Sequence, residues 1–201
     1  MLLKRRLRGQ TLIELLIASA VIAGGLFSAV ALIFSNLRLS DRDSDSVVAI
    51  NLAREGIEQA RELRDSNWLA GNPFDAGMFT AGGDYSATPN WDGKAASDQV
   101  SFDFTADDFS DESVQVKSST EAENQGFLTQ NTGVAANPTP WKRLITFHPI
   151  CDAPGGLTYK NDGETCAGDP TVGVRVESRV RWQRKGQSFE RVLYDDLFDW
   201  R

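Results

Sequence analysis

Hydrophobic and polar positions divide the chain into an uncharged segment, a segment of helical periodicity and a segment of strand-like alternation. The uncharged segment runs from Leu15 to Phe34, and about 20 apolar residues suffice to cross a bilayer as a helix. A single carboxylate, Glu14, stands at its start. Because a charge in lipid costs about 2.5–3.5 kcal/mol on insertion scales, Glu14 indicates a function and a partner. We predict an apolar transmembrane or assembly helix over residues 10–35.

Residues 36–70 continue with the periodicity of an amphipathic helix. Apolar side chains recur three and four positions apart at Val47, Ile50, Ala53, Ile57 and Ala60, and charged residues fill the positions between them. Glycine and proline within residues 71–73 are helix stop signals. The pattern therefore predicts a long helix from about residue 11 to residue 68 with one packed face, and it leaves open a bend near residues 41–46.

Strand-like alternation dominates the C-terminal part of residues 71–201, which we predict to be a globular, β-rich head. A half-buried strand from Val172 to Trp182, a turn at Arg184–Gln187 and a return from Phe189 to Leu197 predict an antiparallel hairpin. Residues Trp141 to His148 predict another strand. The fold class is therefore α+β, with a long N-terminal helix packed on a C-terminal antiparallel sheet.

The stretch from Pro73 to Pro140 predicts long surface loops around one or two short strands, because Gly, Asn, Asp, Ser and Thr are frequent in it. Five acidic residues cluster there: Asp103, Asp107, Asp108, Asp111 and Glu112. Their oxygens are ligands that calcium prefers, but their spacing matches no EF-hand loop. A solvated acidic loop is the favoured interpretation, and calcium binding is the alternative.

Charge is distributed unevenly along the chain. Four cations, Lys4, Arg5, Arg6 and Arg8, precede the apolar segment, and the rest of the chain holds 17 basic and 28 acidic residues. The positive-inside rule places this leader in the cytoplasm and everything after Phe34 outside. An acidic body also argues against general nucleic-acid binding.

The two cysteines, Cys151 and Cys166, then lie in an oxidising compartment, and turn-forming Pro, Gly and Asn residues separate them. We predict a disulfide between them, with two free thiols as the alternative. A metal site has little support because His148 is the only histidine. One histidine and two paired cysteines also provide no catalytic arrangement, so we expect no enzyme and no cofactor.

One basic strip lies outside the leader, at Arg175, Arg179 and Arg181 with Arg184 and Lys185 at the turn. A solvated strand face, or a match to the acidic body of a neighbouring subunit, is the favoured interpretation. DNA contact is the alternative.

Three interpretations fit the N-terminal segment. An ordinary signal peptide, cleaved near Ser28–Ala31, has a shorter apolar region than this one. A plain single-pass anchor explains the length but neither Glu14 nor the glycine, Gly9, at the boundary of the leader. Lys4 to Gly9 followed by Gln10-Thr11-Leu12-Ile13-Glu14 resembles the processing site of type IV pilins and type II secretion pseudopilins.

That resemblance implies a pilin-like fold and specific roles for three residues. A prepilin peptidase would cut after Gly9 on the cytoplasmic side and methylate the new N-terminus, Gln10, and Glu14 would be the assembly residue. The chain departs from many members of the family in starting the mature sequence with Gln10 rather than phenylalanine. It also carries Gly24-Gly25 where many members have a proline.

Electrostatics also explains why Gly9, Gln10 and Glu14 would act together. Cleavage after Gly9 creates an α-amine with an ordinary pKa of about 7.7–8.0, four residues before Glu14. In a bundle of apolar helices, Glu14 of one subunit pairs with the amine of another, which offsets both desolvation penalties and fixes the axial register. Gly24 and Gly25, each costing about 1 kcal/mol in a helix, mark either a place that stretches on assembly or a close helix contact.

The sequence therefore leads us to expect a structural subunit, a minor or specialised pilin of a type IV pilus-like filament. Its partners would be the prepilin peptidase, other pilin subunits and, before assembly, the cytoplasmic membrane, which it would span once before joining an extracellular or periplasmic filament. The alternatives are a pseudopilin of a type II secretion or DNA-uptake system, and a membrane-anchored extracellular binding module that never polymerises.

Overall fold

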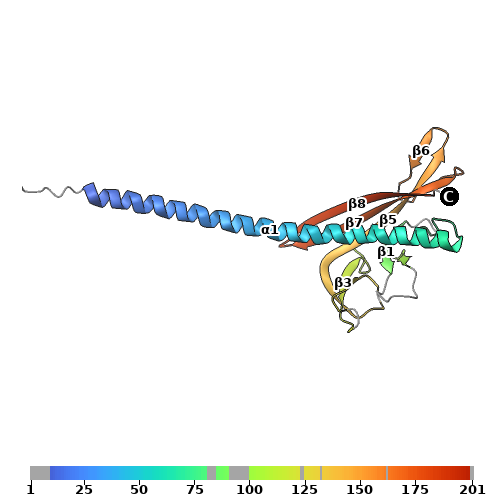
Figure 1. Cartoon of the computed structure of the whole chain (residues 1–201), viewed down its shortest axis with the longest axis horizontal. Helices are drawn as coiled ribbons and strands as arrows, with labels where there is room; N and C mark the ends of the chain where they lie inside the picture. Colours follow the sequence, from blue (N-terminus) through green and yellow to red (C-terminus); the bar gives the residue numbers. More distant parts are fainter. Residues whose placement is uncertain are drawn as a thin grey trace, which may run out of the picture. The chain divides into compact units, whose positions relative to one another are not determined.

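The computed structural model describes residues 10–80, 85–90, 100–122, 125–131, 133–161 and 163–199. It consists of one helix followed by an antiparallel sheet, and it confirms the predicted α+β class (Figure 1). The elements are α1 (Gln10–Ala70), β1 (Ser86–Asn90), β2 (Ser101–Asp103), β3 (Gln115–Ser119), β4 (Leu128–Thr129), β5 (Ala136–Ala153), β6 (Gly156–Tyr159), β7 (Thr171–Arg184) and β8 (Gln187–Phe198).

Helix α1 is unbroken over its whole length, including residues 41–46 and the glycine pair Gly24-Gly25. It ends one residue before Gly71, which has a φ of +74°. The Asn72 N–H donates to the Asn67 carbonyl at 2.9 Å, and the Gly71 N–H donates to the Trp68 carbonyl at 3.2 Å. These two bonds form a Schellman cap, which explains why the predicted stop signal ends the helix.

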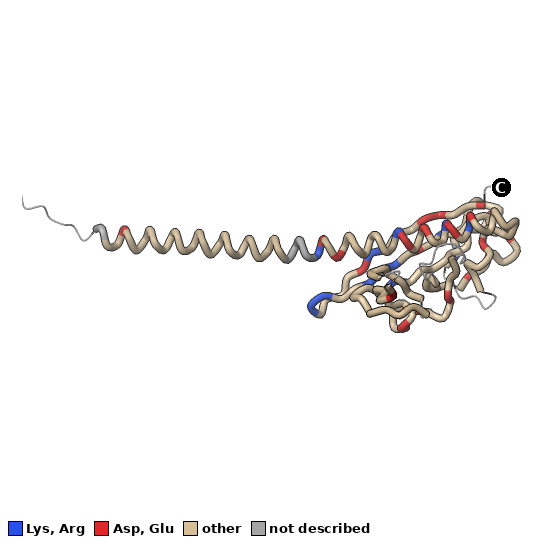
Figure 2. The backbone as a smooth tube through the Cα atoms, turned by 60° about the horizontal axis from the view of Figure 1, so that its bottom comes forward, with Lys and Arg blue, Asp and Glu red and all other residues tan. Residues whose placement is uncertain are grey.

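The chain forms two compact units, one up to Asp45 and one from Ser46 onward. In the first unit, the described side chains from Leu12 to Leu37 are all exposed, and no charge occurs between Glu14 and Leu37 (Figure 2). By length and composition, α1 could cross a membrane. The second unit includes the amphipathic part of α1 together with the whole sheet, and we call it the head.

Strand β5 organises the sheet because it pairs along both of its edges. One edge pairs with β7 from Trp141 to Cys151, and the other pairs with β3, β1 and β6 in turn. The predicted hairpin is confirmed as β7 and β8, joined by a two-residue turn. Lys185 and Gly186 in that turn have φ of +50° and +78°, the left-handed pair that a type I′ turn requires.

The region between the helix and β5 contains more strand than the sequence predicts. We expected one or two strands there, and the described residues of this region form four, β1 to β4. Strand β1 has the sequence SATPN, in which Pro89 and the small polar residues give no alternating pattern. It forms because Ser86 and Ala87 pair with Thr146 and Ile145 of β5, a tertiary contact that periodicity does not report.

One face of the sheet packs on the head part of α1. The core combines buried helix residues with alternate residues of β5 and β7, namely Ala49, Leu52, Ala53, Ile57, Ala60 and Leu63 with Ile145, Phe147, Val174, Val176, Val180 and Trp182. Gly56 is where helix and sheet approach most tightly among the described glycines of α1. A Cβ atom there would lie 2.8 Å from both Ile145 Cδ1 and Ser178 Oγ.

A buried arginine joins the helix to the sheet within this core. The Arg143 guanidinium donates from Nε to Gln130 Oε1 at 2.8 Å and from Nη1 to the Leu52 carbonyl at 3.0 Å. Its Nη1 also lies 3.3 Å from Glu55 Oε1. Burial lowers the pKa of Arg143, and the Glu55 carboxylate opposes that shift. Acceptors from the helix and from Gln130 thus compensate the guanidinium for its burial in the core.

Candidate functional site

The residues predicted to process and assemble the chain lie at the start of α1. Gly9 and the rest of the leader, residues 1–9, lie outside the described residues. Gln10 is the first residue of the helix, and Glu14 is exposed one turn later. Because residues four apart share a helix face, an amine at Gln10 and the carboxylate of Glu14 would be presented on the same side of one helix.

The uncharged segment after Glu14 has few polar groups to satisfy, and it satisfies its hydroxyls internally. Ser19 Oγ donates to the Leu16 carbonyl and Ser28 Oγ donates to the Gly24 carbonyl, both at 2.9 Å. Apart from its chain neighbours and the adjacent backbone of the helix itself, no atom lies within 4 Å of a Cβ added to Gly24 or Gly25. The segment thus presents an apolar surface to its surroundings, and Gly24 and Gly25 are two positions on it without a side chain.

The predicted disulfide is present between Cys151, near the end of β5, and Cys166. Both cysteines are buried, and the bridge closes a loop that contains β6. Further contacts hold β6 to the sheet: Tyr159 donates from its hydroxyl to Asp196 at 3.1 Å and lies 3.9 Å under the Arg175 guanidinium. The disulfide therefore has a structural role: it holds the loop that contains β6 against the end of β5.

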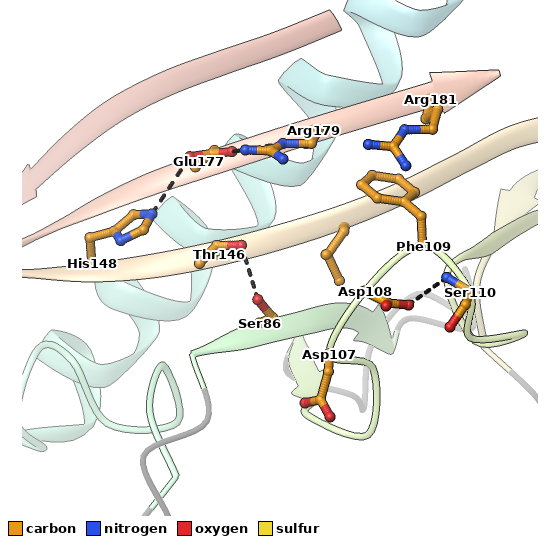
Figure 3. Close-up of a pocket in the computed structure, with 11 residues that line it drawn as sticks. Ser86, Asp107, Asp108, Phe109, Ser110, Thr146, His148, Glu177, Arg179 and Arg181 are labelled. Carbon is orange, nitrogen blue, oxygen red and sulfur yellow. Dashed lines mark hydrogen bonds and ion pairs between the residues drawn. The ribbon is translucent and has the colours of Figure 1, made fainter. Parts of the chain in front are cut away.

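A groove of about 570 Å³ lies on the sheet face opposite α1 (Figure 3). Its floor comes from alternate residues of β5 and β7, and a loop of residues 107–110 forms one wall. The lining residues are Ser86, Asp107, Asp108, Phe109, Ser110, Leu144, Thr146, His148, Glu177, Arg179 and Arg181. We call this space the outer groove.

Phe109 fastens the wall of the outer groove to its floor. The Phe109 carbonyl accepts a hydrogen bond from Lys142 Nζ at 2.7 Å, and the Arg181 guanidinium lies 4.2 Å from the centre of the Phe109 ring. The ring also packs against the small cluster of Ala106, Val114 and Leu144. A loop that the sequence presents as polar and featureless is therefore held in place by one aromatic side chain.

The acidic cluster that the sequence singled out belongs to this loop. Asp108 Oδ1 accepts from the Ser110 N–H at 2.6 Å, and Asp111 Oδ2 accepts from the Asp107 N–H at 3.1 Å. The bonds from Ser110 lower the pKa of Asp108, and Lys142 and Arg181 add to this effect. Within the described parts of the chain, no three His, Cys, Asp or Glu side chains come close enough together to hold a metal ion.

The floor of the outer groove carries a row of interacting polar and charged side chains. His148 Nε2 lies 3.6 Å from Glu177 Oε2, an ion-pair distance that is too long for a hydrogen bond. Glu177 also forms an ion pair with Arg179. His148 is the largest cause of the lowered pKa of Glu177; burial opposes the shift and Arg179 reinforces it. Beside this row, the hydroxyls of Ser86 and Thr146 are hydrogen-bonded at 3.1 Å.

The basic strip predicted on β7 is present but is neutralised in pairs. Arg175 binds Asp196 through two bonds of 2.7 and 2.9 Å, and Arg181 lies 2.8 Å from Glu190. Arg179 is paired with Glu177 of its own strand. The hairpin register brings Asp196 opposite Arg175 and Glu190 opposite Arg181. Counting outward from the turn would have found these partners, whereas the alternation of one strand alone shows only the arginines.

Sequence reasoning did not find the outer groove. Its floor follows from the alternation of β5 and β7, but its wall depends on the tertiary position of Phe109, which carries no local signal.

Comparisons with protein-family models, with curated proteins and with solved structures find no match for this chain.

Proposed function

We propose that this chain is the precursor of a subunit of a type IV pilus-like filament, in a minor or specialised role. The observation that carries the proposal is the part of α1 from Leu12 to Leu37: all its described side chains are exposed, and Glu14 is its one charged residue. A surface of this kind needs a non-aqueous partner, which is lipid before assembly and other copies of the same helix afterwards.

Glu14 gives such a bundle its register. Cleavage after Gly9 would supply an amine at Gln10, and the Glu14 carboxylate of an incoming subunit would pair with it. Apolar side chains alone adhere without a preferred offset, whereas a desolvated ion pair strongly favours one offset. Processing and assembly are then coupled, because the amine exists only in the cut chain.

The head supports a display role for the filament. It is a folded unit with its own core and a disulfide, and the residues of that core are distinct from the exposed apolar residues of the first unit. After Asp45 the sequence contains 15 basic and 24 acidic residues, a formal net charge of −9. Heads that all carry a net negative charge repel one another, so the apolar helices would provide the adhesion between subunits.

Replacing Glu14→Gln tests this proposal, with Glu62→Gln on the exposed face of α1 as a matched control. We expect the Glu14 variant to be cleaved and inserted in the membrane yet absent from the sheared filament fraction, and the Glu62 variant to assemble. Mass spectrometry of the mature chain should find methylated Gln10 at the N-terminus.

Three results would contradict the proposal. An intact Met1 would point to a plain membrane anchor, and a terminus near Ala31 would point to an ordinary signal peptide. Equal assembly of the Glu14 and Glu62 variants would remove Glu14 from the mechanism. A short filament that stays in the envelope and is needed for secretion or DNA uptake would assign the chain to the pseudopilins.

A further inference from the structure

Nine of the eleven residues that line the outer groove are polar or charged, and their formal charges are close to balanced. Asp107, Asp108 and Glu177 contribute three carboxylates, and Arg179 and Arg181 contribute two guanidinium groups. Both guanidinium groups are already paired, Arg179 with Glu177 and Arg181 with Glu190. The groove therefore offers no concentrated charge to attract an anion such as phosphate, and its arginines oppose a simple cation.

The floor of the groove nevertheless has unused hydrogen-bonding capacity. His148 Nε2 is buried and has no hydrogen-bond partner among the described residues. Ser86 and Thr146 bond to each other through their hydroxyls, and each hydroxyl keeps a further acceptor position. Buried polar atoms normally have hydrogen-bond partners, and among the described residues His148 Nε2 has only the 3.6 Å contact with Glu177 Oε2, so it has capacity for a further hydrogen bond.

We propose that the outer groove binds a neutral, polyhydroxylated ligand, that is, a saccharide. A hydroxyl group both donates and accepts, so it can serve a carboxylate, a guanidinium and an imidazole that lie side by side. The Glu177 carboxylate and the Arg179 guanidinium are planar groups that hold each other in position, so little conformational entropy is lost when they bind a ligand. The volume of about 570 Å³ lies within the range of about 300–1,000 Å³ typical of small-molecule sites.

Other ligand classes fit the groove less well. An apolar ligand would bury the ion pairs without offering hydrogen bonds, and only Leu144 and Phe109 in the lining are hydrophobic. Nucleic acid would meet the exposed carboxylates of Asp107 and Asp108. A metal ion would need at least three converging ligands, which the described residues do not provide.

The position of the groove suits a ligand from outside the filament. Its residues lie on the sheet face opposite α1, so bundling of the apolar helices uses none of them. This part of the argument rests on the proposed function, whereas the chemistry of the groove does not. Saccharide binding would give the displayed head a task, adhesion to a glycan-coated surface.

The experiment uses the purified full-length chain in detergent micelles on an array of neutral glycans of one to four sugars, followed by titration calorimetry with the glycans that bind. We expect His148→Ala and Glu177→Gln each to weaken binding by about tenfold or more, because each removes hydrogen bonds to a charged or buried group. Glu164→Gln, the same chemical change on the exposed disulfide loop, should bind like the unaltered chain. Thermal melts of each variant report whether the head remains folded.

If Glu177→Gln fails to fold, Asp107→Asn replaces it, since the Asp107 side chain is exposed on the loop and plays no part in the core. The proposal is overturned if no neutral glycan binds, or if the groove variants and Glu164→Gln bind equally well. Calcium chloride, inorganic phosphate or a tetralysine peptide binding in place of a glycan would also overturn it. Glu14→Gln should abolish filaments and leave glycan binding intact, which separates a failure of this inference from a failure of the proposed function.

Discussion

The two parts of helix α1 share one secondary structure and obtain their stability from different sources. Between Leu12 and Leu37 every described side chain is exposed, whereas between Ser46 and Ala70 one face of the helix is buried against the sheet. The second part therefore has its packing partners within the same chain. The first part has no packing partners among the described residues, and its apolar surface indicates a non-aqueous environment rather than a tertiary contact.

The glycines of the two parts express the same difference. Gly56 is required by a close approach of helix to sheet, whereas Gly24 and Gly25 face open space. Charged groups follow the same division, since Arg143 is enclosed by acceptors from the helix and the sheet, and Glu14 is exposed. The glycine and the charged group of the head are thus explained by contacts within the chain. Gly24, Gly25 and Glu14 have no such explanation, and we propose that assembly provides it.

Arg143→Ala should break the attachment of α1 to the sheet and produce the largest loss of stability. The change leaves the Gln130 side chain and the Leu52 carbonyl buried without their donor, and we expect the free energy of unfolding to fall by about 3–5 kcal/mol. Urea denaturation of the full-length chain in detergent, followed by tryptophan fluorescence, measures it. Arg54→Ala, an exposed arginine on the same helix, is the control, and similar losses in both variants would contradict the role of the buried network.

Alanine substitutions at Gly56 and Gly24 compare the two parts of the helix directly. At Gly56 the new methyl group meets Ile145 and Ser178 at 2.8 Å, so we expect the head to lose about 1–3 kcal/mol of stability through overpacking. At Gly24 the same change meets no atom within 4 Å beyond its chain neighbours and the local helix backbone, and it should leave head unfolding unaltered. Equal effects in the same denaturation assay would refute the distinction between a packed and an unpacked helix.

The acid sensitivity of the head should depend in part on Glu177, a smaller effect. Its pKa is lowered in the folded protein, so its contribution to stability is complete above the ordinary value of 4.5 and is lost as the pH falls through the folded value. Glu177→Gln should therefore flatten the decline of head stability at acidic pH. Thermal melts between pH 7 and acidic pH test this, with exposed Glu62→Gln as the control, and an unchanged decline would contradict it.

The elements that the sequence predicted are those in which local pattern and tertiary environment agree. The hairpin of β7 and β8 combines strict alternation with a turn whose glycine suits positive φ, and the helix combines apolar spacing with a glycine cap. Strands β1 and β6 lacked such agreement. Gly156–Tyr159 lies between the two cysteines, where turn residues suggested a loop, and it becomes a strand because it pairs with Ile150–Ala153 of β5.

The candidate site divides along the same line. The proposed processing and assembly positions can be predicted from sequence because they lie near one another in the chain. The outer groove joins residues from Ser86 to Arg181, and its chemistry exists only after β1, β5, β7 and the loop of Phe109 meet. The arginines of the basic strip follow from the alternation of one strand, whereas their acidic partners lie mainly across a strand pair.

The way Phe109 holds its loop has a consequence for how this protein changes over evolutionary time. The loop is attached to the sheet through one ring and one carbonyl, while Asp107, Asp108 and Ser110 beside it contribute to the groove without belonging to the core. If the groove binds a ligand as we propose, substitution at those three positions would alter what it recognises while the fold stays intact. Related lineages could therefore diversify their surface specificity with few mutations, and a protein engineer could do the same by randomising these positions.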